Sequence, residues 1–215
     1  MAGDLARAVG PARAARVAAA LAEAGTALDH GRGRDAARLL RPLVSQAPDV
    51  AAVREMAGVA QYQLGRWVEA AGHLEAAARL SGSAEQHPAL ADCYRALGRY
   101  ARVDELWEEL RQASPSAAIV TEGRIVAAGA LADQGRLGPA IALLERGQPR
   151  GRRPPAGHHL RLWYALADLY ERSGDTVRAR ELFARVAAAD PSLADTAERL
   201  EALGEGGRRS HPARP

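Results

Sequence analysis

The sequence is poor in cysteine and contains no long apolar run. Cys93 is the only cysteine among the 215 residues, which excludes an internal disulfide and a zinc site built from several cysteines. The longest apolar stretch, Ile125–Ala132, is far below the ~18 residues that a membrane-spanning helix needs. The first residues interleave arginine with alanine and include Asp4, unlike the apolar core of a signal peptide. We therefore expect a cytoplasmic protein in a reducing compartment.

Lysine and asparagine are absent, and aromatic residues make up only 4% of the chain. All 29 basic residues are therefore arginines, a bias that looks like that of a GC-rich, actinobacterial-like bacterial genome. The net charge of +3 and the pI near 9.5 permit binding to nucleic acid or another anionic surface, but 26 acidic residues are interspersed with the arginines. The charge of the whole chain thus decides little about the partner.

The few aromatic residues fall at regular positions in the stretch Leu160–Pro191. Its residues follow the order W-x2-L-[GA]-x2-Y and then a turn glycine, a small residue, an aromatic and a proline, at Trp163, Leu166, Ala167, Tyr170, Gly174, Ala179, Phe183 and Pro191. This stretch resembles a tetratricopeptide repeat. Apolar residues every three or four positions predict one helical face, and Gly174 ends that helix before a second one begins. The resemblance implies a helical hairpin whose two helices cross at Ala167 and Ala179, where small residues permit close approach.

Four more copies of this unit precede it, and together the copies predict an all-α fold. Measured between the turn glycines, the spacings are 34, 33, 37 and 39 residues, from Gly31, Gly65, Gly98, Gly135 and Gly174. A period of 34 residues is that of the tetratricopeptide repeat, and the longer intervals indicate inserted loop residues near 114–120 and 147–157. The resemblance implies a right-handed superhelical solenoid of antiparallel hairpins, as one domain over residues 1–203. The predicted repeats are about 17–50, 51–83, 84–117, 121–153 and 160–191.

The ends of several helices can also be predicted. Ser83, followed three residues later by Gln86, predicts a capping box at the start of the third repeat. Ser192 and Asp195 predict the start of a capping helix that covers the last hairpin over residues 192–203. Residues 204–215 are rich in glycine and arginine and are expected to be a disordered basic tail. Trp163, Tyr170 and Phe183 are expected to be buried between the last hairpins and this cap.

Catalytic and metal-binding patterns are lacking. No phosphate-binding glycine motif, serine-hydrolase elbow or HExxH pair occurs in the sequence. Cys93 occupies a slot that other copies fill with alanine, so we interpret it as a buried packing residue rather than a nucleophile. His158 and His159 are neighbours on a helix and should point about 100° apart, which disfavours joint chelation. We expect no enzyme activity, no catalytic residue, no cofactor and no metal.

The resemblance instead implies protein binding in the concave groove, which the family lines with first-helix residues. By the repeat register the groove residues are Glu55, Val59, Tyr62, Gln63, Glu85, Asp92, Arg95, Glu122, Ile125, Asp133, Arg161, Tyr164, Asp168 and Glu171. Acids dominate this set, whereas the second helices carry arginines mostly on their outer face. These residues predict a scaffold or adaptor whose partner is another protein, in the form of a basic and apolar peptide or helix. The lysine and asparagine clamp by which some family members hold a carboxylate tail is missing.

Two alternatives stay open from the sequence. The first is a nucleic-acid-associated protein that uses the loop Arg150–Arg153 and the tail arginines Arg208, Arg209 and Arg214, although nucleic-acid binding is disfavoured because the aromatics occupy packing positions. The second is a helical accessory domain for an enzyme. No membrane partner is expected, and the sequence does not indicate an oligomeric state.

Overall fold

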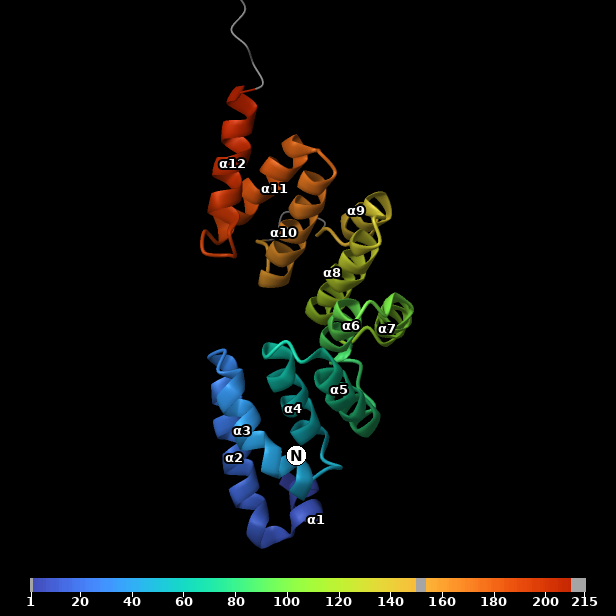
Figure 1. Cartoon of the computed structure of the whole chain (residues 1–215), viewed down its shortest axis with the longest axis vertical. Helices are drawn as coiled ribbons and strands as arrows, with labels where there is room; N and C mark the ends of the chain where they lie inside the picture. Colours follow the sequence, from blue (N-terminus) through green and yellow to red (C-terminus); the bar gives the residue numbers. More distant parts are fainter. Residues whose placement is uncertain (1, 150–153, 210–215) are drawn as a thin grey trace, which may run out of the picture. The chain divides into compact units, whose positions relative to one another are not determined.

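The described residues, 2–149 and 154–209 of this computed structural model, form helices joined by turns, and no strand occurs among them (Figure 1). The all-α prediction is confirmed. The chain divides into two compact units, unit 1 over Met1–Pro115 and unit 2 over Ser116–Pro215, and each is described by itself. The single domain over residues 1–203 stays a prediction.

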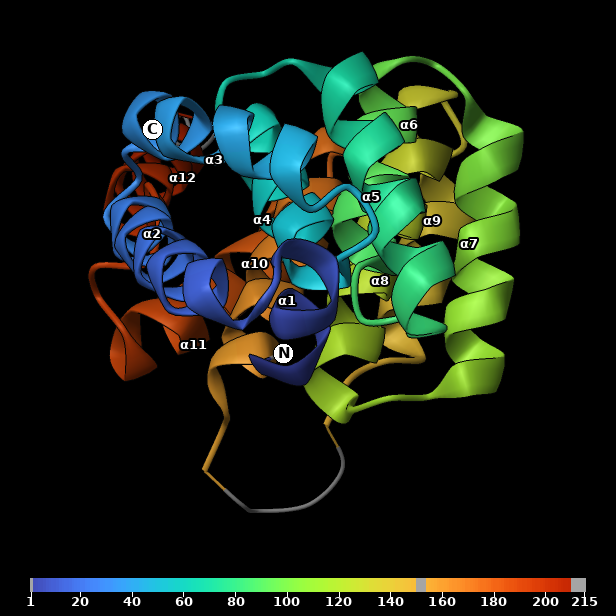
Figure 2. The same ribbon diagram turned by 90° about the horizontal axis from the view of Figure 1, so that it is seen from below.

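Unit 1 contains three helical hairpins preceded by a short helix. Its helices are α1 (Ala2–Val9), α2 (Pro11–Asp29), α3 (Gly33–Gln46), α4 (Ala51–Gln63), α5 (Trp67–Ser81), α6 (His87–Ala96) and α7 (Tyr100–Ala113). The pairs α2–α3, α4–α5 and α6–α7 are the hairpins, and α4 lies between α3 and α5 in two perpendicular views (Figures 1 and 2). The repeat pattern does not extend to α1, which buries Leu5 in the same core as α2 and α3.

Unit 2 contains two hairpins and a final single helix. Its helices are α8 (Ala117–Asp133), α9 (Leu137–Glu145), α10 (Gly157–Arg172), α11 (Thr176–Ala189) and α12 (Thr196–Arg209). The hairpins are α8–α9 and α10–α11, and α12 packs on α11 as the predicted cap should. Trp163, Tyr170 and Phe183 are buried in this unit, with Phe183 fully inaccessible, so the predicted burial is confirmed.

The turn inside each hairpin depends on a glycine in the left-handed conformation. The φ angles of the five predicted turn glycines lie between 67° and 86°, at Gly31, Gly65, Gly98, Gly135 and Gly174. A side chain on Cβ makes this region costly, so glycine is the usual residue where a helix ends in this way. At each turn the amide of the following residue also bonds back to a carbonyl five residues earlier, as from Arg66 to Gln61. The prediction of these turns is confirmed.

The predicted start of the third repeat is wrong by three residues. Helix α6 begins at His87, and its N-cap is Gln86 rather than Ser83, with no side-chain capping bond. The reason is Pro88, which is favoured in the first turn of a helix but would break one that had begun at Ser83. Ser83 instead accepts a hydrogen bond from the amide of Glu85, two residues on. The capping box is therefore replaced by a local turn.

Two boundaries in unit 2 also differ from the prediction. Residues 117–120 belong to α8 rather than to an inserted loop, because the Ser116 hydroxyl caps the amide of Ile119 and starts the helix there. Helix α12 begins at Thr196, since Asp190 holds residues 190–192 in a turn by accepting bonds from the amide and hydroxyl of Ser192.

The helix α12 continues to Arg209, six residues beyond the predicted end, so residues 204–209 are helical rather than disordered. The glycines of this segment lower helix propensity but keep both backbone hydrogen-bonding groups, so they weaken the helix without ending it. Residues 210–215, the rest of the predicted tail, lie outside the described part of the chain.

A tyrosine near the end of the first helix links successive hairpins in both units. In unit 2 the Tyr170 hydroxyl donates to Glu145 of the preceding hairpin at 2.5 Å, and the guanidinium of Arg178 lies 4.3 Å from the ring centroid. In unit 1 Tyr94 repeats this arrangement, with Glu75 of the preceding hairpin and Arg102 of its own. A hydrogen bond to a carboxylate and a cation over the ring each favour one position of the next hairpin.

Replacing Tyr170 by Phe should lower the free energy of unfolding of unit 2 by about 1–2 kcal/mol, because the hydrogen bond to Glu145 is lost while the ring stays. Chemical denaturation of the full chain, followed by circular dichroism, measures this loss. The matched control is Tyr100→Phe, since Tyr100 is half-buried and has no hydrogen bond recorded for its hydroxyl among the described residues. Equal losses in the two variants would contradict a specific role for the Tyr170 hydroxyl.

Candidate functional site

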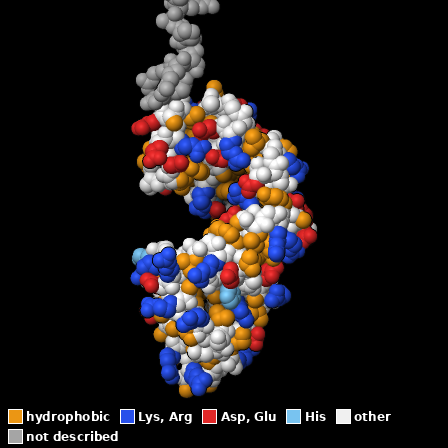
Figure 3. All heavy atoms as spheres, viewed as in Figure 1, with side chains coloured by type: hydrophobic (Ala, Val, Ile, Leu, Met, Phe, Trp, Pro, Cys, Tyr) orange, Lys and Arg blue, Asp and Glu red, His pale blue; other side chains and the backbone are white. Residues whose placement is uncertain are grey.

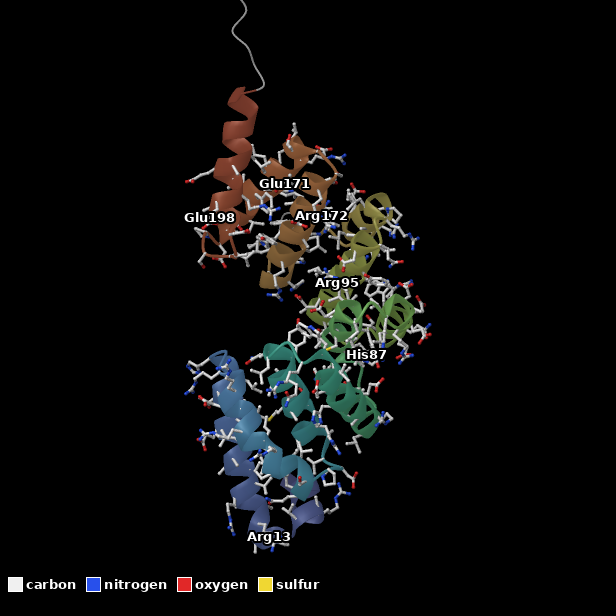
Figure 4. The ribbon with its side chains drawn as sticks, in the orientation of Figure 1. Arg13, His87, Arg95, Glu171, Arg172 and Glu198 are labelled. Atoms are coloured by element: carbon white, nitrogen blue, oxygen red, sulfur yellow. The ribbon has the colours of Figure 1, made fainter. Side chains whose placement is uncertain are left out.

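The predicted groove residues lie on the first helices of the hairpins, and each unit presents its own set. In unit 1 the α4/α6 face consists of Glu55, Val59, Tyr62, Glu85, Asp92 and Arg95, with Glu85 in the turn just before α6. In unit 2 the α8/α10 face consists of Glu122, Ile125, Arg161, Tyr164, Asp168 and Glu171. Figure 4 labels Arg95 on the first face and Glu171 on the second. Two further predicted residues differ, since Gln63 donates to the backbone of Leu28 and Asp133 is exposed at the end of α8.

On the α4/α6 face, Tyr62, Asp92 and Arg95 form a connected polar chain. The Tyr62 hydroxyl donates to Asp92 at 2.6 Å, and Arg95 lies 3.4 Å from the other carboxylate oxygen. Burial, with a further contribution from Asp92, raises the pKa of Tyr62, so its hydroxyl stays protonated. The Tyr62 ring also packs edge-on against Trp67, with centroids 5.4 Å apart. This tyrosine is therefore fixed in place and presents only part of its ring.

The acids Glu55 and Glu85 are different, because neither forms an ion pair with any residue that the structure describes. Burial raises the pKa of Glu55, the nearby charge of Glu85 raises it further, and a hydrogen bond from Gln86 opposes both effects. Two carboxylates that repel each other favour a cation between them. Among the described residues, these two acids are therefore not neutralised by an ion pair.

A hollow of about 730 Å³ opens beside Glu55, at the ends of α1 and α5 and the start of α4. Its lining includes Ala52 and Leu80, and 43% of Leu80 is exposed, which is unusual for a large apolar residue in this chain. Arg7 and Asp49 lie at the same hollow and carry opposite charges. A negative group next to exposed apolar surface can accept a side chain that has both characters, such as arginine or lysine.

On the α8/α10 face, by contrast, the acids are already paired with arginines of the same unit. Arg161 donates to Glu122 at 2.6 Å. Arg199 of α12 binds Asp168 at 2.9 Å and Glu171 at 2.7 Å (Figure 4, which labels Glu171). Burial opposes the charge of Arg199, but its hydrogen bonds to the two acids outweigh that effect and raise its pKa. These positions therefore have little negative charge left for a ligand.

Arg199, which decides the charge of this face, has no place in the repeat pattern and was not predicted as a site residue. Its guanidinium also lies 5.0 Å from the centroid of the Phe183 ring. Tyr164 is engaged in the same way, since its hydroxyl donates to Asp195 and burial, followed by that bond, raises its pKa to about 12. The spacing of Asp195 and Arg199, four residues apart on the cap, was the available signal that this helix presents charge to the last hairpin.

The residues considered as a nucleophile or as metal ligands, Cys93, His158 and His159, do not form a reactive centre. Cys93 is fully buried, and burial followed by the charge of Asp92 raises the pKa of its thiol to about 12, in keeping with a packing role. The rings of His158 and His159 lie 4.1 Å apart and are tilted by 53°. His159 accepts a bond from the amide of Ala156. Within residues 2–149 and 154–209, no group of three His, Cys, Asp or Glu residues is placed to hold a metal.

The basic segments that could contact nucleic acid lie largely outside the described residues. Arg150–Arg153 and Arg214 lie there, and Arg208 and Arg209 end α12. Among the helices that the structure describes, none combines the length and the apolar character needed to cross a membrane.

The fold and these faces define a class, the helical repeat proteins, in which hairpins stack and present residues of their first helices to a ligand. Within that class, the sequence model of the tetratricopeptide repeat matches residues 21–85 and 160–205, which together make up just over half of the chain. The chain belongs to the tetratricopeptide repeat family, as its repeat pattern predicted. No curated protein matches the sequence.

Solved structures share this fold over most of the chain, including the hairpins between the two matched segments. A thermophilic TPR protein of Thermus thermophilus, TTC0263, aligns over 88% of this chain and 99% of its own, with 16% identity and a TM-score of 0.68. A putative kinesin light chain of Podosopora anserina with TPR-like repeats covers 91% and 98%, with 21% identity and a TM-score of 0.61. YrrB, a TPR protein with an unusual peptide-binding site, covers 88% and 90%, with 15% identity and a TM-score of 0.52. At these identities the likeness is one of fold.

Proposed function

We propose that this protein is a non-catalytic scaffold that binds a segment of another protein, and that the α4/α6 face of unit 1 is its binding surface. Proteins of the tetratricopeptide repeat family generally mediate protein–protein interaction. The observation that carries the choice of face is the pair Glu55 and Glu85, two carboxylates without a cationic partner among the described residues. The ligand segment supplies an arginine or lysine for this pair and an apolar residue for the hollow near Leu80.

The α8/α10 face shows how two acids on the first helix of a hairpin can hold an arginine. Arg199 sits between Asp168 and Glu171 with an aromatic ring beneath its guanidinium, which is an arginine site filled from within the chain. Unit 1 has no α12 of its own. Of the described arginines near its face, Arg95 is held at Asp92, and Arg7 lies at the hollow beside Glu55. We expect a ligand arginine to bind Glu55 and Glu85 in a comparable way, although these two acids stand at other positions of the repeat.

The test is a titration of the full chain with a short synthetic peptide that carries two arginines and two leucines on one helical face, followed by fluorescence anisotropy. Replacing Glu55 and Glu85 together by Gln should weaken binding several-fold, because an ion pair at a partly exposed site is worth about 0.2–1 kcal/mol. The matched control is the double variant Glu181→Gln, Glu201→Gln, which removes two exposed acids of unit 2. Binding that is unchanged in the first variant, or equally weak in the control, would remove this face from the mechanism.

The same titration should depend on pH in a defined direction. The peptide cation binds the ionised form of Glu55, and the pKa of Glu55 is raised, so Glu55 takes up its proton at a higher pH than an ordinary glutamate does. Affinity should therefore fall as pH is lowered through this raised pKa, before exposed carboxylates titrate. In Glu55→Gln this part of the fall should disappear. An identical pH profile in wild type and variant would contradict the role of Glu55.

A salt series distinguishes this function from nucleic-acid binding. Phosphate contacts give a steep linear fall of log affinity with log salt, whereas one or two ion pairs beside an apolar contact give a shallow one. A single-stranded oligonucleotide that binds more tightly than the peptide, with a steep salt dependence, would favour the arginine-rich loop and tail instead.

A further inference from the structure

A second surface of unit 1 carries the opposite charge. Arg34, Arg38 and Arg41 follow one another at intervals of four and three residues, which places them on one stripe of α3. Arg66, the N-cap of α5, lies across the same hollow. All four arginine side chains are exposed. Arginines gather over this lower part of the molecule in Figure 3. The stripe from Arg34 to Arg41 spans about 10 Å along the helix axis, which is two helical turns.

The floor between these arginines is apolar. The hollow has a volume of about 600 Å³ and its lining includes Leu40, Val44, Ala57 and Leu64, contributed by α3 and α4. Since α4 lies between α3 and α5 (Figures 1 and 2), it forms the base, and the two outer helices carry the charged rim. Val44 and Leu64 are only half-buried, so part of the floor remains open to a ligand. We call this surface the arginine hollow.

The positive charge of the arginine hollow is poorly compensated. Asp35 is the one acid paired with a rim arginine among the described residues, and it lies 3.9 Å from Arg38 with both side chains at least half exposed. Arg34 and Arg41 form no ion pair with any described residue. Arg66 bonds only the amide oxygen of Gln61, at 3.3 Å. The other basic residue at the base, His73, has a lowered pKa because of burial and the charge of Arg54, so it adds no charge at neutral pH.

We propose that the arginine hollow binds an acidic amphipathic helix of a partner protein, with its carboxylates on the arginine rim and an aliphatic side chain on the floor. Arginine suits carboxylates because its planar guanidinium can bond both oxygens at once. The lining contains no Phe, Tyr or Trp ring on which a nucleotide base could stack, and its aliphatic floor matches leucine, valine or isoleucine. A helix of two to three turns fits the length of the stripe.

This inference does not depend on the α4/α6 face. The two surfaces lie in the same unit but prefer ligands of opposite charge, so each can fail without the other. The acidic helix α7 of a second copy is a weaker candidate, because its acids Glu105, Glu108 and Glu109 are already paired with Arg102, Arg111 and His87. A partner helix with unpaired acids would form new ion pairs with the rim arginines and should therefore bind more tightly.

The experiment uses the full chain and a fluorescent, helix-forming synthetic peptide with glutamates at positions i, i+4 and i+7 and leucines at i+1 and i+5. We expect saturable binding, and no binding of the same peptide with glutamine in place of each glutamate. The variant Arg34→Gln, Arg41→Gln should weaken binding at least about tenfold. The matched control is Arg79→Gln, Arg180→Gln, which removes two exposed arginines that have no ion pair among the described residues and should bind as the wild type does.

A second variant tests the floor separately from the charge. Val44→Thr keeps the size and charge of the site and adds a hydroxyl. It should therefore lower the affinity for the peptide several-fold while leaving the unfolding midpoint of the protein nearly unchanged. The proposal is overturned if the arginine variant binds as tightly as wild type or if the control loses as much affinity. It is also overturned if a single-stranded oligonucleotide binds as tightly as the peptide and Val44→Thr has no effect, because the hollow would then be a general polyanion site.

Discussion

Phe183→Ala is expected to destabilise unit 2 by about 3–5 kcal/mol, the usual cost of deleting a core aromatic ring. Phe183 is fully inaccessible to solvent, and its ring meets the edge of Tyr164 at a centroid distance of 5.5 Å. The guanidinium of Arg199 lies on the ring as well. Loss of the ring therefore leaves a cavity in the last hairpin and weakens the contact of α12 with α10 and α11.

Chemical denaturation of the full chain measures this effect, followed by the fluorescence of Trp163 in a background where Trp67 and Trp107 are replaced by Phe. The control is Val177→Ala on the same helix, where 68% of the side chain is exposed and a change within about 0.5 kcal/mol is expected. A loss below about 1 kcal/mol for Phe183→Ala would mean that the repeat register assigned to the last hairpin is wrong.

The sequence predicted the hairpins well because their signals are local. A turn glycine, a small residue at the helix crossing and an aromatic such as Phe183 each depend on a few neighbours along the chain. The five glycines with positive φ, the burial of Cys93 and the packing of Trp163 all follow from this register. Helix α1 was missed because it lies before the first repeat and has no landmark, although its Leu5 is fully buried.

The charge of the candidate groove could not be predicted in the same way. The repeat register places Asp168 and Glu171 on a first helix, but it does not reveal that Arg199, far along the chain, bonds both of them. Ion pairs between elements depend on how helices pack and on side-chain reach. The register therefore indicated where the ligand positions lie but not how much charge remains there. It could not show that Glu55 and Glu85, unlike Asp168 and Glu171, form no ion pair with a described residue.

Helix starts were missed where two local signals competed. The serine at position 83 has the spacing of a capping box, yet Pro88 requires a later start and decides the outcome. At the cap, Asp190 and Ser192 form a turn of their own before α12 begins. In both places a proline or a side chain that bonds the backbone overrides the pattern of apolar residues.

Gly58→Ala and Gly72→Ala should change stability in opposite directions, although both replace a helical glycine of the same hairpin. Alanine is favoured over glycine inside a helix by about 1 kcal/mol, so Gly72→Ala, whose new Cβ would meet nothing within 4 Å, should stabilise unit 1 by about that amount. At Gly58 the new Cβ would lie 2.7 Å from Cγ and 3.2 Å from the backbone nitrogen of Leu74, which is itself fully buried.

The helices α4 and α5 would have to move apart to relieve this contact, because neither a branch carbon nor a backbone atom can turn away. Overpacking of this kind costs about 1–3 kcal/mol, and we expect it to exceed the gain in helix propensity. Chemical denaturation of the two variants in parallel measures the change in the free energy of unfolding of each. If Gly58→Ala were as stabilising as Gly72→Ala, α4 and α5 would not cross at Gly58, and the small residue at that position would have no structural cause.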